Sequence, residues 1–498
     1  MLIKQNTDEI QSFFADASNM QGGHAMRVLF PGKAQEVADV LFSATRERVP
    51  VTIAGAGTGI VGGRVPFGGV VLATSRLNRI KEIALDESGA WAVAEAGVVL
   101  ADFQRAVNAR GLIYPPDPTE WSCYLGGTVA TNASGPRTFK YGATRNFIRR
   151  LEVALATGDR LDLRRGEVKA DENGVLHLPL PGGKSIDARL PSYKMPRTRK
   201  HASGYFIEPE MDAIDLFIGS EGTLGVIVEV ETKLLPKPEG VLSGVVFFKA
   251  KSDLLSFVSE ARAASLRTRA SADTDGIDAR ALEFFDAESL KFLKRRYSRV
   301  PDEMAGAIFF EQETSARTEE NLQAAWLELL ERHNAMLDDS WFATNEPDRK
   351  EMSEFRHKLP VLVNEWLARH NQRKVSTDMA VPDEEFAAML KFYEDTLREA
   401  NLGYVIFGHI GDNHVHVNIM PRDEREAGRA REIYMLFVER AVRVGGTISA
   451  EHGIGKLKRE YLRVLYSEEH LKEMAALKRA FDPACILGRG NIFDEEYL

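Results

Sequence analysis

Three histidines in one short segment have the spacing of metal-binding or acid–base residues. The run GHIGDNHVHVNI at 408–419 holds three of the chain's 11 histidines. We expect YVIFGH to form a strand, Gly-Asp-Asn at 411–413 a turn and HVHVN a second strand. Because side chains alternate between the two faces of a strand, His414, His416 and Asn418 should share one face.

A second segment supplies a carboxylate and a further imidazole. ISAEHGIGKLKREYL places Glu451 and His452 at a glycine-bounded bend, and His409, which precedes the turn, can fold back toward the histidine strand. Two imidazoles and one carboxylate around an open position form a catalytic metal site, for which zinc is the first choice and manganese or iron are alternatives. The competing interpretation is that these histidines are exposed residues of a turn.

A glycine-rich loop in the N-terminal half has the spacing of a dinucleotide-binding motif but not its context. GTGIVG at 57–62 follows the strand-like VPVTIA with G-x-G-x-x-G spacing. A Rossmann loop needs a helix that begins within the glycines. Pro66 and the glycines after it predict a second strand instead, so the backbone amides at 55–63 form a loop that can cradle phosphate. An ordinary glycine-rich hairpin is the alternative.

Further segments of the same half combine glycine with small polar residues: PPDPTE at 115–120, LGGTVATNASG at 125–135, KYGATRNFI at 140–148 and IGSEGTLGVI at 218–227. Glycine lets the backbone lie against a flat ligand, and Ser, Thr and Asn add neutral hydrogen bonds. Together with the 57–62 loop, these segments resemble, in order, the FAD-binding domain of the vanillyl-alcohol oxidase and p-cresol methylhydroxylase superfamily over residues 20–240.

The resemblance implies which residues contact FAD. The loop amides would bind the pyrophosphate, the following segments would lie along the cofactor, the 221–227 residues would lie at its adenine end and the C-terminal GRGNIF would return to the flavin. The implied contacts are Gly55, Ala56, Gly57, Thr58, Gly59, Pro116, Asp117, Gly127, Asn132, Ser134, Gly135, Gly142, Glu221, Gly222, Ile227 and Asn491. The histidine that carries covalent flavin in some relatives has no counterpart in GAGTGIVGG, so we expect non-covalent FAD.

From about residue 240 to the C-terminus the chain resembles the FAD-linked D-2-hydroxy-acid dehydrogenases, which include D-lactate dehydrogenase, the flavin subunit of glycolate oxidase and D-2-hydroxyglutarate dehydrogenase. The resemblance implies FAD-dependent, metal-assisted oxidation of a small D-2-hydroxy acid to the 2-oxo acid, with hydride transfer to flavin N5. A D-lactate-like and a D-2-hydroxyglutarate-like substrate both remain open. The implied roles are His409, His416 and Glu451 as metal ligands, His452 as catalytic base, Asn418 as a substrate contact and Arg356 as the partner of the substrate carboxylate.

Two departures from the family pattern bear on the site. The usual turn is Gly-Asp-Gly-Asn-Leu-His, whereas this chain has Gly-Asp-Asn-His-Val-His, so His414 is an additional imidazole that could be a ligand or lie behind the ligands. In hydroxyglutarate enzymes a lysine that binds the distal carboxylate precedes Tyr-Asp. Here KVSTDMAVP has Lys374 displaced and Ser376-Thr377 before Asp378, which argues against a dicarboxylic substrate.

Other functions share the fold. An alkyl-glycerone-phosphate-synthase-like transferase is the first alternative, but its active-site run is rich in adjacent histidines, whereas here an acid precedes a single His452. A flavin-binding electron-transfer subunit without a substrate site would not need the set of His409, His416, Glu451, His452 and Arg356. An aldonolactone-type oxidase is compatible with the flavin half but needs no metal.

The elements that position these residues are typical of an α+β protein. At 498 residues we expect a two-subdomain FAD-binding domain of the vanillyl-alcohol oxidase type at 1–240, an α+β substrate (cap) domain at 241–440 and a C-terminal helical return at 441–498 that packs on the FAD domain. Residues 1–50 predict two helices around a strand. Helices are expected near 252–265, 279–297, 318–334, 423–444 and 467–480.

Composition limits the possible partners. A net charge of −9 argues against nucleic acid, and an anionic substrate would need local positive charge. Two cysteines, no leader peptide and no long apolar run predict a cytoplasmic protein without a transmembrane segment, with peripheral membrane association left open. The expected small-molecule partner is the 2-hydroxy acid. The electron acceptor (quinone, electron-transfer flavoprotein or cytochrome) and a homodimeric state are left open.

Overall fold

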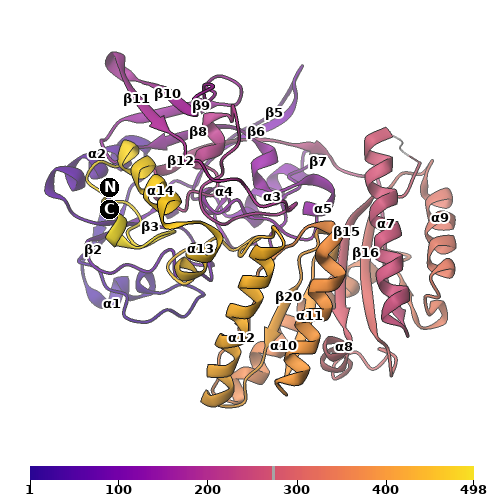
Figure 1. The fold of residues 1–498 in the computed structure, drawn as a ribbon. Coiled ribbons are helices and arrows are strands. Elements are labelled where there is room, and N and C mark those ends of the chain that lie inside the picture. Colours follow the sequence, from indigo (N-terminus) through magenta and orange to yellow (C-terminus); the bar gives the residue numbers. More distant parts are fainter. Residues whose placement is uncertain (272–274) are drawn as a thin grey trace.

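The glycine loop joins two strands that run parallel. The computed structural model describes residues 1–271 and 275–498 (Figure 1). Strands β3 (Val51–Ala54) and β4 (Val70–Ala73) pair in parallel with Val51 opposite Val70. The hairpin alternative is therefore wrong, because a hairpin joins antiparallel strands. Residues 55–69, all of them described, contain no helix, so the Rossmann interpretation is also ruled out, as the prolines and glycines predicted.

A four-stranded sheet in the order β1-β2-β4-β3 carries this loop at one edge. Its first strands are β1 (Leu2–Lys4) and β2 (Arg27–Phe30), with α1 (Thr7–Ile10) between them and α2 (Ala34–Glu47) after them. The apolar face of α2 packs on this sheet and on the neighbouring one, where Val37 and Leu41 share a core with Leu72 and Val228. The predicted pair of helices around a strand is thus confirmed.

The short β-rich runs of residues 80–233 form a five-stranded antiparallel sheet in the order β5-β6-β12-β8-β9. Its strands are β5 (Ile80–Asp86), β6 (Gly89–Glu95), β8 (Ile148–Ala154), β9 (Arg160–Arg164) and β12 (Val226–Lys233). Between them lie α3 (Leu100–Asn108), α4 (Leu125–Ala130), α5 (Thr138–Tyr141), α6 (Ala213–Phe217), and the hairpin β10 (Val175–Leu180) and β11 (Lys184–Arg189). The short strand β7 (Leu112–Ile113) also lies between them and pairs with β13 (Leu235–Pro236), which follows β12.

The second half is built on a seven-stranded antiparallel sheet in the order β17-β14-β16-β15-β19-β20-β18. The bounds are β14 (Gly240–Phe248), β15 (Ala279–Asp286), β16 (Gly306–Thr314), β17 (Trp341–Phe342), β18 (Val375–Ser376), β19 (Tyr404–Gly408) and β20 (His416–Ile419). Helices cover both faces. Val246 and Phe248 therefore lie in one core and Val245 and Phe247 in the other, which explains why these strands are apolar without alternation.

The expected helix at 279–297 is wrong in its first half. Residues Ala279–Asp286 form β15, and only Ala287–Lys294 form a helix, α8. The helices predicted near 252–265, 318–334, 423–444 and 467–480 are present as α7 (Lys251–Ser271), α9 (Glu319–Arg332), α12 (Glu424–Arg443) and α14 (Glu468–Phe481). Three further helices, α10 (Glu346–Arg369), α11 (Phe386–Glu399) and α13 (Arg459–Leu465), had not been predicted.

The C-terminal segment returns to the first half of the chain, so the two termini lie close together in Figure 1. Val51 donates to the Ile486 carbonyl at 2.8 Å, and Gly488 donates to the Val51 carbonyl at 3.0 Å. The α+β class with a C-terminal helical return is therefore confirmed, while the domain bounds at 240 and 440 stay a prediction. Among the described helices, none combines the length and apolar character that a membrane crossing requires.

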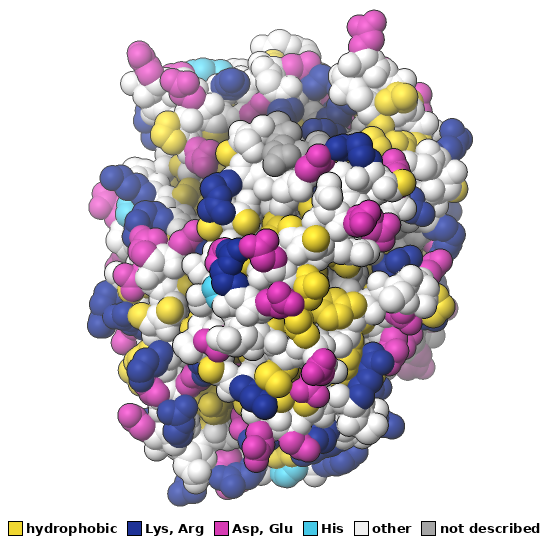
Figure 2. Space-filling view, turned by 90° about the vertical axis from the view of Figure 1, so that its right-hand side faces the viewer, with side chains coloured by type: hydrophobic (Ala, Val, Ile, Leu, Met, Phe, Trp, Pro, Cys, Tyr) yellow, Lys and Arg dark blue, Asp and Glu magenta, His cyan; other side chains and the backbone are white. Residues whose placement is uncertain are grey.

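Acidic and basic side chains are interspersed on the face that carries α9, as Figure 2 shows. Neither sign of charge is gathered in one patch on this face. What decides the binding of an anion is then the local arrangement of charges around the site.

Candidate functional site

A cleft of about 390 Å³ lies where the glycine loop, the α4 region and the C-terminal segment meet. Most of the predicted FAD contacts line it: Gly55, Ala56, Gly57, Thr58, Gly59, Gly127, Ser134, Glu221, Gly222, Ile227 and Asn491. Glu451 and His452 belong to the same wall. Two residues of the histidine–carboxylate constellation, which sequence analysis treated separately, therefore lie on the wall of the predicted FAD cleft.

The other predicted FAD contacts are not among the residues that line the cleft. Asp117 Oδ2 is 3.2 Å from Arg137 Nε, and Asn132 accepts the Arg145 amide hydrogen at 3.0 Å. A Cβ on Gly135 would lie 1.9 Å from the Asp117 carbonyl oxygen. Pro116 is buried, and Gly142 has a φ of +81°. These residues shape the backbone of the cleft, and their direct contact with FAD stays a prediction.

The cleft fits a flat cofactor that needs close backbone approach. No heavy atom lies within 4 Å of a Cβ built on Gly59 or on Gly127, although both residues line the cleft, so a side chain there would project into open space that a ligand could use. At Gly126, by contrast, no side chain fits, because its Cβ would lie 2.5 Å from the Ala96 Cβ. The residues present thus agree with a cradle for the isoalloxazine and pyrophosphate groups.

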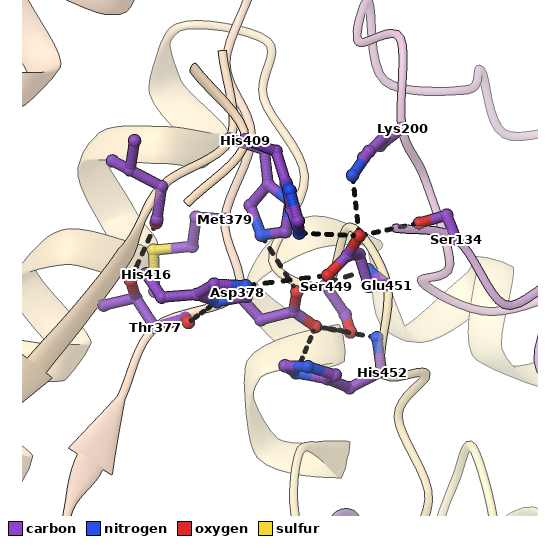
Figure 3. Close-up of polar contacts among 12 residues, drawn as sticks. Ser134, Lys200, Thr377, Asp378, Met379, His409, His416, Ser449, Glu451 and His452 are labelled. Atoms are coloured by element: carbon purple, nitrogen blue, oxygen red, sulfur yellow. Dashed lines mark hydrogen bonds and ion pairs between the residues drawn. The ribbon is translucent and has the colours of Figure 1, made fainter. Parts of the chain in front are cut away.

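The histidine segment folds as predicted and converges on Glu451 (Figure 3). His409 Nε2 lies 3.2 Å from Glu451 Oε1, and His416 Nε2 lies 3.6 Å from Glu451 Oε2. Each of these residues and His414 offers a ligand atom, and the four atoms all lie within 4.8 Å of one another. His409 is 5% exposed and His414 0%, so the interpretation as exposed turn histidines is wrong.

The turn itself explains this convergence. After β19, Ile410–Asp412 form one 3-10 turn, and Asn413 takes a left-handed φ of 52° that starts the return. His409 and His416 thereby face one another, with ring centroids 5.6 Å apart, although they lie on opposite sides of the turn. The donor set of two imidazoles and a carboxylate fits a divalent metal such as zinc.

Glu283, which sequence analysis did not identify, joins a metal-ligand candidate to Arg356. Its Oε1 lies 2.7 Å from His409 Nδ1, and its Oε2 accepts from Arg356 Nε at 2.9 Å. Burial alone would raise the pKa of Glu283, but the charges of His409 and Arg356 lower it to about 2. Burial alone would lower the pKa of His409, but the charges of Glu283 and Glu451 raise it. Arg356 is thus held by Glu283 and is not among the residues that line the cleft, so its contact with a substrate carboxylate stays a prediction.

Lys200 also escaped sequence analysis, and its ammonium group is fully buried beside Glu451. Lys200 Nζ donates to Glu451 Oε1 at 2.6 Å and to the Gly135 carbonyl at 3.0 Å, and Ser134 Oγ donates to the same Glu451 oxygen at 3.0 Å (Figure 3). Burial opposes ionisation of Glu451, but His409 and Lys200 hold its pKa well below the usual range. Glu451 is therefore a carboxylate at neutral pH.

A second buried carboxylate, Asp378, lies on the other side of the Glu451–His452 segment. Its Oδ2 is 3.1 Å from His452 Nδ1 and 2.7 Å from Lys458 Nζ. Burial would raise its pKa, but the charges of His452 and Lys458 hold it well below the ordinary value. Burial also lowers the pKa of His414 to about 3, so this imidazole, 3.2 Å from Asp378, is neutral.

Glu221 ties the cleft wall to the segment after His452. It accepts from the backbone N–H groups of Ile454 at 2.7 Å and Gly455 at 2.6 Å. Burial raises its pKa to about 7 in spite of these two hydrogen bonds. The predicted position at the adenine end stays a prediction, but the contact shows that Glu221 also fixes the loop that carries His452.

The predicted substrate contact Asn418 is 1% exposed and lies on β20, where Ser376 of β18 is its cross-strand partner. Its Nδ2 donates to the His416 carbonyl at 3.4 Å. Lys374 immediately precedes β18 and is exposed. The position opposite Asn418 is therefore occupied by a hydroxyl and not by an ammonium group.

Comparison with known proteins agrees with this geometry. Residues 25–164 match a family described as an FAD binding domain, and residues 249–492 match the C-terminal domain of FAD linked oxidases. The chain is 32% identical to glycolate oxidase subunit GlcD of Bacillus subtilis over 483 residues, covering 94% of this chain and 89% of that protein. The chain therefore belongs to the FAD-linked oxidoreductase family defined by these two domains.

Other relatives carry names of hydroxy-acid dehydrogenases. D-lactate dehydrogenase of Anaerostipes hadrus is 29% identical, with 97% of this chain and 93% of that protein covered. D-2-hydroxyglutarate dehydrogenase of Stutzerimonas stutzeri is 27% identical, with 99% and 96% covered. The protein is thus an FAD-linked oxidoreductase whose relatives act on small hydroxy acids.

Solved structures show the same fold at low identity. A 4-ethylphenol oxidase from Gulosibacter chungangensis superposes with a TM-score of 0.67 at 18% identity, covering 99% of this chain and 95% of that one. An alkyldihydroxyacetonephosphate synthase superposes with a TM-score of 0.66 at 15% identity, covering 98% and 82%. These similarities confirm the vanillyl-alcohol oxidase type of fold.

Proposed function

We propose that the protein oxidises a small D-2-hydroxy acid, of the size of D-lactate, to the 2-oxo acid with non-covalent FAD and the help of a divalent metal. The observation that carries the proposal is that His452 lies on the wall of the glycine-lined cleft beside the His409, His416 and Glu451 cluster. The His416 and His452 rings are stacked with centroids 5.4 Å apart, so base and ligand candidates adjoin.

The reaction removes a proton from the hydroxyl group and a hydride from the same carbon. Bound FAD would accept the hydride, and a bound metal would lower the pKa of the hydroxyl group as a Lewis acid. His409, His416 and Glu451 would hold the metal through two imidazole nitrogens and a carboxylate. His452 would accept the hydroxyl proton, because it lines the cleft beside the ligand candidates and histidine is the side chain that most often serves as a general base. Its 27% exposed side chain gives that proton a route to solvent.

Charge around the cluster would set the metal preference. Lys200 shares Oε1 of Glu451 with Ser134, so only part of that carboxylate's charge is available to a metal. Imidazole and carboxylate ligands suit zinc first, with manganese and iron as alternatives. We therefore propose a single zinc ion per chain, held by three protein ligands with an open position for substrate.

The size of the substrate follows from the residues around Asn418. In the described strands the neighbour of Asn418 on β18 is Ser376, and Lys374 lies outside the strand on the surface. A second substrate carboxylate would thus lack a buried cation at this position, which favours a monocarboxylic hydroxy acid. The 2-carboxylate itself would pair with Arg356, whose guanidinium can form two parallel hydrogen bonds with it.

A panel of D- and L-2-hydroxy acids with an artificial dye acceptor tests this proposal. The holoenzyme is assayed as isolated, after chelation, and with Zn²⁺ or Mn²⁺ restored. We expect turnover with D-lactate-like acids only, lost on chelation and restored by metal. Preference for D-2-hydroxyglutarate would contradict the assignment of substrate size, and turnover that survives exhaustive chelation would contradict the role of the metal. The natural acceptor, a quinone, an electron-transfer flavoprotein or a cytochrome, is then identified by replacing the dye.

A further inference from the structure

The buried carboxylate of Asp378 accepts hydrogen bonds from several groups around the Glu451–His452 segment. It follows β18, its side chain is 1% exposed, and both oxygens are engaged (Figure 3). Oδ2 accepts from Ser449 Oγ at 2.6 Å, Lys458 Nζ at 2.7 Å and the His452 backbone N–H at 3.0 Å. Oδ1 accepts from the Glu451 backbone N–H at 3.2 Å.

These contacts fix a short segment that is not part of a helix or a strand. Glu451 and His452 are followed by Gly453, whose φ is +77°, so the local backbone lacks the hydrogen-bond ladder of regular structure. Asp378 replaces that ladder by accepting from two successive backbone N–H groups. The direction of the Glu451 carboxylate and the direction of the His452 ring therefore depend on one anchor.

The same carboxylate decides which nitrogen of His452 carries a proton. Lys458 and Ser449 donate to Oδ2, and an ionised carboxylate can only accept hydrogen bonds. His452 Nδ1, 3.1 Å away, must therefore be the donor. The Nε2 lone pair is left free on a ring that lines the cleft.

We propose that Asp378 is the positioning residue of this site: it anchors the Glu451–His452 segment and holds His452 in the Nδ1–H form, so that Nε2 can act as the base. The proposal rests on the proposed function, because the base role of His452 belongs to it. Asp378 itself does not line the cleft and acts only through its neighbours. In acid–base sites, a buried carboxylate commonly orients the imidazole that transfers the proton.

The first test measures the tautomer of His452 in the unmodified holoenzyme by NMR of protein labelled with ¹⁵N in the histidine rings. The His452 signals are assigned by their loss in His452→Ala. We expect the proton on Nδ1. A proton on Nε2 would overturn the proposal, whatever the substrate turns out to be.

The second test compares Asp378→Asn with a matched control, Asp482→Asn. Asp482 is likewise buried, pairs with Lys478 at 2.8 Å and accepts the Leu487 backbone N–H at 2.8 Å, but lies outside the site. An amide has one accepting oxygen instead of two, so Asp378→Asn cannot accept both from the Glu451 backbone N–H and from the donors at Oδ2, and the anchor of the Glu451–His452 segment is weakened. We expect Asp378→Asn to slow flavin reduction at saturating D-lactate by roughly 10²–10⁴-fold, with KM changed by less than about threefold, the pattern of a lost general base.

The control separates positioning from stability. Asp482→Asn should lower the melting temperature and leave the rate of flavin reduction unchanged. Because Asp378, His416 and His452 also bring ligand atoms within 4.8 Å, metal content is measured in each variant. Metal lost from Asp378→Asn with the Nδ1 tautomer retained would make Asp378 a ligand and refute the proposal, as would an unchanged rate. If no hydroxy acid reduces the unmodified enzyme, the proposed function fails, while the tautomer measurement still decides the role of Asp378.

Discussion

Replacing Glu283 by glutamine should lower both the stability of the folded protein and the affinity of the site for zinc. The pKa of Glu283 is about 2 in the folded chain against an ordinary value of 4.5. At about 1.4 kcal/mol for each tenfold change, this difference corresponds to about 3 kcal/mol of stabilisation at neutral pH. Since the folded pKa is depressed, the contribution is present in full above pH 4.5 and is lost as pH falls through about 2. Glu283→Gln therefore removes this stabilisation at every pH above 4.5.

The local consequence follows from the two partners of Glu283. Without the carboxylate, His409 loses the hydrogen bond that orients its ring, and Arg356 loses its ion partner. Loss of such a partner of a metal ligand lowers metal affinity by about 10–100-fold. We expect the free energy of unfolding of Glu283→Gln to fall by about 3 kcal/mol. Zinc affinity should fall by about 10–100-fold, and KM for the hydroxy acid should rise.

Urea unfolding and zinc competition with a chromophoric chelator measure these quantities. The matched control is Glu311→Gln, which breaks the 2.8 Å ion pair with Arg280 on the same sheet but touches no ligand candidate. The control should lose stability and keep its zinc affinity. Equal zinc affinities of Glu283→Gln and the unmodified protein would refute the reasoning, because Glu283 would then have only a structural role.

Three further outcomes are expected. Acid precipitation should release the flavin into the supernatant, because the 55–63 loop has no histidine; flavin that stays with the precipitated polypeptide would contradict this. Elemental analysis should find about one metal per chain, stripped by His416→Ala; loss of metal from His414→Ala but not from His416→Ala would move the ligand role to His414. Arg356→Ala should raise KM as well as lower kcat, because the guanidinium would bind the substrate carboxylate in ground and transition states alike; steady-state kinetics with an unchanged KM would remove it from the substrate site.

The sequence predicted the flavin half well because its signals are local. Pro66 and the glycines after it forbid a helix, and the structure has a strand there. Period-2 alternation likewise placed His414 and His416 together, since a strand offers only two faces. Local pattern misleads where an element is buried on both faces: the run of β15 lacks alternation, so its sequence predicts a helix, whereas the structure has a strand. Helix α10 contains Pro360 and a weak apolar stripe, so it had not been predicted.

The residues behind the site could not be found from spacing. Lys200, Glu283 and Asp378 are single charges from three separate segments, and only the fold brings them to Glu451, His409 and His452, respectively. One signal was present: Glu283 interrupts the apolar run ALEFF at 281–285, and a charge within a buried strand needs a partner. The sequence therefore indicates that Glu283 needs a polar or charged partner, but it does not indicate which residue that partner is.

Anaerobic mixing of the holoenzyme with D-lactate and with L-lactate, followed by flavin absorbance in a stopped-flow instrument, tests the central claim most directly. We predict that D-lactate bleaches the flavin of the metal-containing enzyme in a single turnover and that L-lactate does not. His452→Ala should fold and bind FAD as before, yet reduce its flavin roughly 10²–10⁴-fold more slowly. A flavin that no D-2-hydroxy acid bleaches, or a His452→Ala variant as fast as the unmodified enzyme, would contradict the account.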